Sequence, residues 1–172
     1  MKTIVSAAIA ALLATTAAHA GDYTAGDIKV VHPMAFETAP TAQVAGGYMS
    51  IENAGTTDDT LIEVRVARIP RIELHLSETD ANGVARMTRQ EGGIPIAAGE
   101  TVSLQPGGLH VMFMGLDGDP FELGEEIEAT LVFEQAGELA VTFSVEARSA
   151  ADHRAMDHSG HSMDHATDKK PE

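Results

Sequence analysis

The stretch from Arg71 to Leu116 reads RIELHLSETDANGVARMTRQEGGIPIAAGETVSLQPGGLHVMFMGL. Its first and last parts alternate apolar and polar residues, which is the pattern of strands that are buried on one face. The dipeptide Asn82-Gly83, a strong turn signal, lies between two strand-like runs. We therefore predict a hairpin through this turn and a third strand at residues 109–114 within reach of it.

Candidate metal ligands lie on all three of these predicted strands. His110, Met112 and Met114 share one face of the third strand, because side chains alternate between faces along a strand. His75 lies in the alternating run IELHL, and Met87 follows the turn. The hairpin brings these last two together, so two imidazoles and two thioethers are predicted to converge, while Met114 is expected to pack beneath them.

This combination of side chains favours Cu(I). The thioether sulfur of methionine is soft and uncharged, so it adds little to the binding of Zn²⁺, Mg²⁺ or Ca²⁺. It suits Cu(I), and imidazole suits copper in either oxidation state. A single methionine in a strand is more often a packing residue. The prediction of a Cu(I) site therefore depends on four residues on adjacent strands, namely His75, Met87, His110 and Met112.

The same four residues resemble the signature of the periplasmic PCu(A)C copper chaperones, H-M-x10-M-x21-H-x-M. His75 and Met87 have the spacing of the first half, and His110 and Met112 match the closing H-x-M within PGGLHVMFMGL. Leu76 stands where the pattern has an optional methionine, and 22 residues rather than 21 separate Met87 from His110. An additional loop residue leaves the strands free to keep their register.

Short strands separated by turn residues are expected along the rest of the chain. They are predicted near Ile28–His32, Gly47–Asn53, Thr60–Val66, Ile72–Ser77, Val84–Gln90, Thr101–Leu104, Leu109–Gly115, Glu125–Phe133 and Leu139–Glu146. This spacing predicts an all-β Greek-key sandwich or barrel. The resemblance, which extends over about residues 28–145, implies the cupredoxin-like version of that architecture.

The N-terminal segment has the features of a secretory signal peptide. Residues 1–20, MKTIVSAAIAALLATTAAHA, combine one lysine, a short apolar core and the small-residue ending Ala18-His19-Ala20. We expect cleavage near Gly21, a folded domain over residues 21–148 and a periplasmic location. No later stretch is apolar enough to be inserted in a membrane.

Composition excludes several classes of function. The chain has 11 basic and 26 acidic residues, and removal of Lys2 with the signal peptide leaves a net charge of about −16, which disfavours nucleic acid and anionic lipid. The absence of cysteine excludes disulfides, a thiolate nucleophile and a blue-copper centre. Neither a G-x-S-x-G motif nor a glycine-rich phosphate loop is present, so the sequence does not indicate an enzyme.

The C-terminal residues 149–172 have almost no aliphatic side chains other than alanine, and we expect a disordered tail. Imidazoles interspersed with aspartates suit Cu(II), which takes nitrogen and oxygen ligands, although Ni²⁺ and Zn²⁺ also bind histidine clusters. The tail is expected to capture Cu(II) or to raise the copper concentration around the domain. Its candidate ligands are His153, Met156, His158, His161, Met163 and His165.

Three further residues with metal-binding chemistry are assigned structural roles. His32 and Met34 flank Pro33, and we interpret them as a strand exit with packing contacts. Met49, in the run GGYMSIEN, is expected in the core.

Together these features predict a periplasmic copper chaperone that carries Cu(I). The resemblance implies delivery to the copper centre of a respiratory haem-copper oxidase, through cytochrome c oxidase subunit II or a related copper-delivery protein. Two alternatives stay open at this point. One is a copper storage or tolerance protein without a delivery role, and the other is a copper enzyme, which would need an open coordination site and a substrate pocket.

Overall fold

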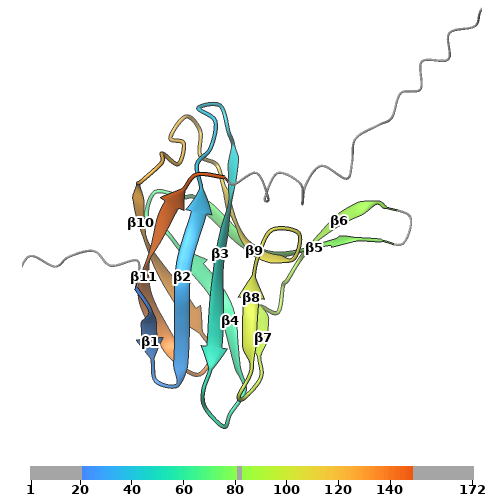
Figure 1. Ribbon diagram of the computed structural model, residues 1–172, viewed down its shortest axis with the longest axis vertical. Helices are drawn as coiled ribbons and strands as arrows, with labels where there is room; N and C mark the ends of the chain where they lie inside the picture. Colours follow the sequence, from blue (N-terminus) through green and yellow to red (C-terminus); the bar gives the residue numbers. More distant parts are fainter. Residues whose placement is uncertain (1–20, 81–82, 149–172) are drawn as a thin grey trace, which may run out of the picture.

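A computed structural model describes residues 21–80 and 83–148, and these ranges contain strands, turns and loops (Figure 1). The strands are β1 (Tyr23–Ala25), β2 (Ile28–Phe36), β3 (Val44–Asn53), β4 (Asp59–Arg65), β5 (Arg71–Thr79), β6 (Ala85–Arg89), β7 (Ile94–Ile96), β8 (Thr101–Leu104), β9 (Leu109–Met114), β10 (Glu126–Phe133) and β11 (Gly137–Glu146). Within the described ranges, no helix has the length and hydrophobicity to cross a bilayer. The prediction of an all-β fold is confirmed.

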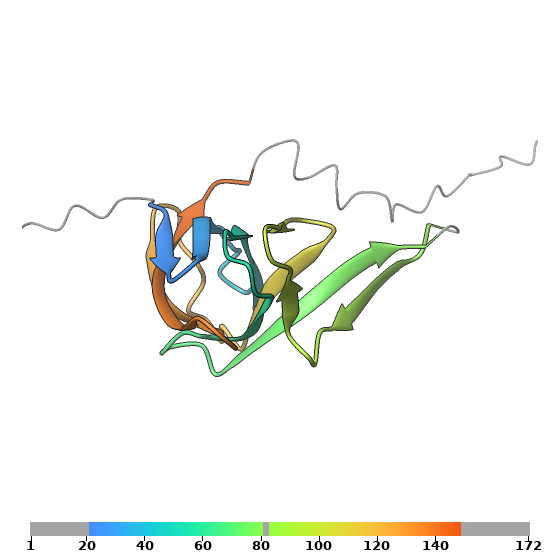
Figure 2. The same ribbon diagram turned by 90° about the horizontal axis from the view of Figure 1, so that it is seen from below.

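The strands form one mixed sheet in the order β6-β5-β9-β3-β2-β11-β10-β4-β7, with β1 added to β2 and β8 added to β3. The pairing of β11 with β2 is parallel, and the remaining pairs are antiparallel. Viewed from below, the sheet curls around a central core, and the β5–β6 hairpin extends to one side of it (Figure 2). The strands that carry the predicted ligands therefore form one flank of the sheet.

Aromatic rings fill the centre of the curled sheet. Phe113 packs edge to face against Phe121 and Phe143, with ring centroids 5.3 Å and 5.6 Å apart. Gly47 on β3 lets these rings approach the backbone, because an added Cβ would lie 2.7 Å from Phe113. Since β9 carries Phe113 on its inner face, the same packing fixes the position of the ligand-bearing strand.

The main differences from the sequence-based strand assignment concern three strands. The three-residue strands β1 and β7 were not predicted, because so few residues carry no visible alternation. β2 does not end at His32 as expected but continues to Phe36 through a bulge, where the pairing with β3 shifts between Val31 and Met34. The expected strand exit at His32-Pro33-Met34 is therefore wrong, since a bulge accommodates the proline inside the strand.

Candidate metal centre

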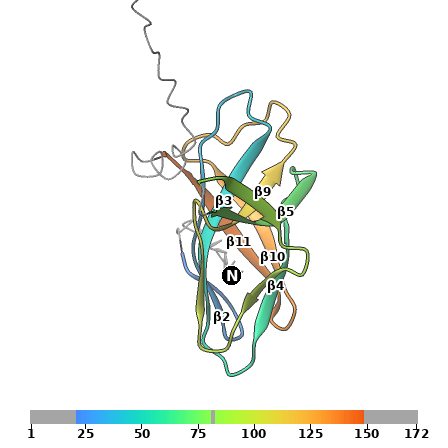
Figure 3. The same cartoon turned by 90° about the vertical axis from the view of Figure 1, so that its right-hand side faces the viewer.

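His75 on β5 and His110 on β9 lie directly opposite each other in an antiparallel pair. Directly opposed residues project from the same face of a sheet. The two imidazole rings pack edge to face, with their centroids 5.8 Å apart. Figure 3 shows β3, β9 and β5 next to one another on this flank. The register of one strand pair thus brings the two predicted histidines together.

The two predicted methionines are placed by the same registers. Met112 follows His110 by two residues and lies on the same face of β9. Met87 on β6 is directly opposite Ser77, which shares a face of β5 with His75. Met87, His110 and Met112 line one cavity of about 190 Å³. His75 is not among the described residues that line it, but its ring packs against the ring of His110.

The hydrogen bonds of His75 determine which of its nitrogens is available to a metal. Its Nε2 is 2.8 Å from Oε2 of Glu73. An ionised carboxylate only accepts hydrogen bonds, so Nε2 carries a proton, and in the neutral ring that metal binding requires Nδ1 has the free lone pair. That Nδ1 atom is buried and has no hydrogen-bond partner among the described residues. A buried nitrogen that accepts no hydrogen bond is expected for a metal ligand in the absence of its metal.

His110 has the complementary arrangement. Its Nδ1 lies 3.0 Å from the carbonyl oxygen of Gly108 and donates to it, which leaves Nε2 unprotonated. The side chain is buried, and burial lowers the pKa of His110 below its ordinary value, an effect that outweighs the opposing hydrogen bond to Gly108. The nearby His75 lowers the same pKa further. His110 is therefore held neutral, as metal binding requires.

Glu73 contacts a predicted ligand, and the sequence analysis did not single it out. Besides His75, its buried carboxylate accepts hydrogen bonds from Arg71, at 2.7 Å, and lies 3.3 Å from Nη1 of Arg89. The hydrogen bond from His75, followed by that from Arg71, lowers the pKa of Glu73. The carboxylate thus stays charged and fixes the orientation of His75. Its position two residues before His75, on the same strand face, is the signal that could have identified it.

Aromatic side chains border the cavity on the β2–β3 side. Phe36 and Tyr48 pack with ring centroids 5.5 Å apart. Gly46 is opposite Met112, and a Cβ there would lie 2.9 Å from Cζ of Tyr48, so the glycine lets the tyrosine ring approach the site. Arg148 closes the border, with its guanidinium 5.0 Å from the Phe36 centroid.

The remaining predicted sulfur and imidazole residues lie elsewhere. Met49 is buried in the core, as predicted. Met114 is half-buried opposite Arg71 and Val44 and does not belong to the described residues that line the cavity. The six tail ligands from His153 to His165 lie outside the described residues, as does the expected signal peptide.

The chemistry of this cluster depends on its thioethers. Across residues 21–80 and 83–148, no three histidine, aspartate or glutamate side chains are grouped so that they could hold a metal ion. Two neutral imidazoles alone are an incomplete site for most divalent metals. With two thioether sulfurs added, the four neutral donors suit a soft monovalent ion such as Cu(I).

Comparison with known proteins identifies the family. Residues 28–145 match the family described as "LpqE-like: Putative lipoprotein LpqE-like". A protein of Leifsonia xyli subsp. xyli (strain CTCB07), named "Putative lipoprotein Lxx21020", is 30% identical over 117 residues, which cover 68% of this chain and 69% of that protein. The copper-bound PCuAC domain from PmoF2 is 30% identical with a TM-score of 0.63, and the match covers 74% of this chain and 99% of that domain.

The chain belongs to the LpqE-like PCuAC copper-chaperone family. A second PCuAC relative is the protein DR1885 from Deinococcus radiodurans in its Cu(I) form, which is 26% identical with a TM-score of 0.54. That match covers 67% of this chain and 76% of the relative. The predictions of the PCuAC family and of a cupredoxin-like fold are confirmed, and relatives of this chain bind copper. The family description of lipoproteins agrees with a place outside the cytoplasm.

Proposed function

We propose that this PCuAC chain is a periplasmic copper carrier that holds one Cu(I) ion through His75, Met87, His110 and Met112. The observation that carries the proposal is the buried Nδ1 of His75, which has no hydrogen-bond partner among the described residues and belongs to a ring that packs against the ring of His110. Each imidazole uses one nitrogen in a hydrogen bond to the protein and has the other available. One Cu(I) ion bound there would be coordinated by both free nitrogens and by the two thioether sulfurs.

Release of the ion is supported by the exposure of Met87. Met87 is 52% exposed, whereas His110 is 5% exposed. A ligand from a partner protein can therefore replace Met87 first, while the two histidines keep hold of the ion. Thioethers are neutral and bind copper more weakly than thiolates do, so the exchange does not require the displacement of an anionic ligand. A non-catalytic transfer role follows from this arrangement.

The recipient we propose is the copper centre of a respiratory haem-copper oxidase, on subunit II of cytochrome c oxidase. Val44 is an exposed apolar residue that lines the same cavity as Met87, and the two side chains offer a surface on which a partner can dock. Transfer by ligand exchange requires such direct contact. A storage protein, the alternative function, would have no need for an exposed ligand.

Methionine methyl NMR on the full chain tests the ligand set and the delivery step. Addition of Cu(I) should shift the methyl signals of Met87 and Met112 and leave that of Met49 in place. Met87→Leu and Met112→Leu should each weaken Cu(I) binding sharply, while the free energy of unfolding falls by less than about 1.5 kcal/mol because volume is conserved. Met49→Leu is the matched control and should bind Cu(I) as wild type does.

The copper-free soluble domain of subunit II is then added to the loaded chain. If the chain is a carrier, the shifts of Met87 and Met112 revert as the acceptor gains copper. Shifts that persist beside a copper-free acceptor would indicate storage, and an unshifted Met112 would refute the ligand set itself.

A further inference from the structure

A second group of metal-binding side chains is created by the bulge in β2. Val30 points into the core before the bulge and Pro33 points into it afterwards, so the alternation of the strand changes phase between them. In an unbroken strand His32 would share the inward face of Val30. The bulge turns both His32 and Met34 outward instead, at the cost of a left-handed backbone at His32, whose φ is 50°.

A carboxylate from the neighbouring strand completes the group. Ser144 on β11 is paired with Met34, and Glu146 follows two residues later on the same outer face. Nε2 of His32 lies 3.0 Å from Oε1 of Glu146, and the hydroxyl of Ser144 is 3.2 Å from the same oxygen. Imidazole, carboxylate and thioether thus come together from two parallel strands.

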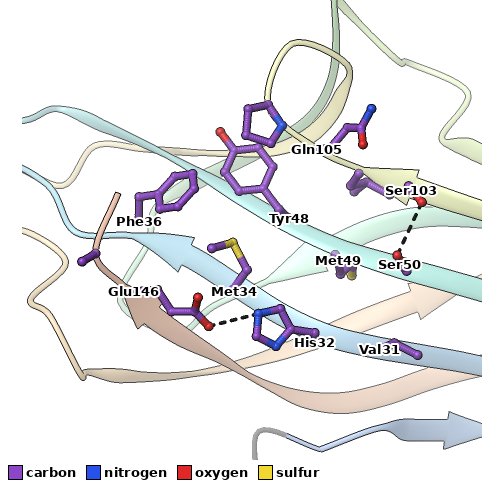
Figure 4. A pocket seen from close by; sticks show the side chains of 13 residues that line it. Val31, His32, Met34, Phe36, Tyr48, Met49, Ser50, Ser103, Gln105 and Glu146 are labelled. Atoms are coloured by element: carbon purple, nitrogen blue, oxygen red, sulfur yellow. Dashed lines mark hydrogen bonds and ion pairs between the residues drawn. The ribbon is translucent and has the colours of Figure 1, made fainter. Parts of the chain in front are cut away.

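These three side chains lie in a groove of about 400 Å³ between β2, β3, β8 and the end of β11. Figure 4 shows the sulfur of Met34 between the His32–Glu146 pair and the rings of Phe36 and Tyr48. The groove is open enough for an ion to reach it, since the side chains of His32 and Glu146 are 54% and 39% exposed. Strained backbone that holds such side chains in a groove is typical of functional sites.

We propose that His32 Nε2, a carboxylate oxygen of Glu146 and Met34 Sδ form a second copper site, which takes Cu(II). Nitrogen and oxygen donors in a tetragonal plane, with a long bond to an axial thioether, match the preferences of that ion. Two donors bonded to a metal at right angles, each at about 2.0–2.1 Å, are roughly 2.9 Å apart. The pair in the structure is separated by 3.0 Å. Copper bound at that angle would lie beside the line that joins the two atoms, so the two exposed side chains would rotate and release the proton between them while the backbone stays in place. Water would fill the open positions.

The second site is separate from the proposed Cu(I) centre. Phe36 and Tyr48 line both the groove with His32 and the cavity with His110, so this ring pair stands between the two sites. The donor sets also differ, because a charged carboxylate replaces one imidazole and one thioether. Loss of His32 therefore leaves Cu(I) binding at His75 and His110 intact, which distinguishes a failure of this inference from a failure of the proposed function.

The test uses the full chain with His153, His158, His161 and His165 replaced by alanine, so that the tail histidines do not compete. Copper(II) sulfate is titrated while backbone amide signals are followed by NMR, since paramagnetic Cu(II) broadens the signals of nearby residues. We expect early broadening at residues 31–35 and 144–147. His32→Asn should lower the apparent Cu(II) affinity of this region at least about tenfold. Asparagine tolerates a left-handed backbone, so the bulge is preserved.

Three controls make the outcome decisive. Ser103→Ala lies in the same groove and should leave the broadening unchanged. Met34→Leu should weaken Cu(II) binding less than His32→Asn does, because an axial thioether is a weak ligand. In the His32→Asn chain, Cu(I) should still shift the methyl signals of Met87 and Met112. Broadening that is absent from β2 and β11, or that survives His32→Asn, would overturn the proposal, and so would Zn²⁺ binding there as tightly as Cu(II).

Discussion

At the scale of single residues, the proposed Cu(I) site depends on groups that never touch the ion. Glu73 fixes the tautomer of His75, and the carbonyl of Gly108 fixes that of His110. Each imidazole therefore needs little reorganisation when copper binds, which favours rapid loading. The spacing in the sequence predicted both histidines as ligands, and the structure places them opposite each other. It did not single out Glu73, because one carboxylate among 26 acidic residues resembles a solvated surface group.

Glu73→Gln tests this positioning role. Glutamine keeps the shape of the side chain but loses the charge that orients His75 and attracts Arg71. Cu(I) affinity should fall by about 10- to 100-fold, a typical effect of losing a group that orients a ligand. Competition titrations with a Cu(I) chelator measure it. Glu78→Gln, at an exposed position of the same strand, is the control and should bind Cu(I) normally.

The methyl signals check that the Glu73→Gln variant still binds Cu(I) at the same site. The Glu73→Gln chain should still shift Met87 and Met112 at saturating Cu(I), because the four ligands remain. Wild-type affinity in this variant would mean that His75 is oriented by its packing alone.

At the scale of elements, the β5–β6 hairpin carries two of the four proposed ligands and lies at one end of the sheet. β6 is an edge strand whose five residues are all exposed, and it pairs with β5 alone. The Asn82-Gly83 turn and the alternation around it predicted this hairpin correctly. Its projection away from the core could not be predicted, because that depends on how far the sheet curls before β5 leaves it (Figure 2).

Copper should stabilise this hairpin. In the absence of metal, hydrogen bonds to β5 are what hold β6, so its amides should exchange readily with solvent. Bound Cu(I) would connect Met87 on β6 to His110 and Met112 on β9, and exchange from β6 should slow about tenfold or more. Hydrogen exchange followed by NMR measures this, with β10 and β11 as internal references. Equal slowing in Met87→Leu would show that the sulfur does not make the connection.

The bulge in β2 could not be predicted from the alternation of apolar and polar residues. Alternation before His32 and after Pro33 is out of phase, so a reader of the sequence sees the end of one strand. The reason that the strand continues lies in a distant segment, since the last three residues of β11 pair with Met34, Ala35 and Phe36. Non-local pairing of this kind is invisible in local sequence, and it carries the proposed Cu(II) site.

At the scale of the whole molecule, the aromatic core positions a strand that carries two of the four proposed Cu(I) ligands. Phe113 lies on the inner face of the strand that carries His110 and Met112 on its outer face. The site side of β9 is therefore positioned by packing on its core side, where Phe113 meets Phe143. The sequence showed the outer pattern of β9. It could not show that Gly47 provides the space for these rings, because glycine by itself is equally typical of a turn.

Gly47→Ala tests how closely this core is packed against β3. A Cβ at Gly47 would lie 2.7 Å from Phe113 and 3.1 Å from Phe143, so the rings or the strand must move. The free energy of unfolding should fall by about 1–3 kcal/mol, as overpacking of cores does, and Cu(I) affinity should fall with it because β9 shifts. Urea denaturation and Cu(I) competition measure the two effects. Gly92→Ala adds the same methyl group in open space and should change stability by less than about 0.5 kcal/mol. Normal Cu(I) binding by a destabilised Gly47→Ala chain would show that the Cu(I) site does not depend on the packing of the core.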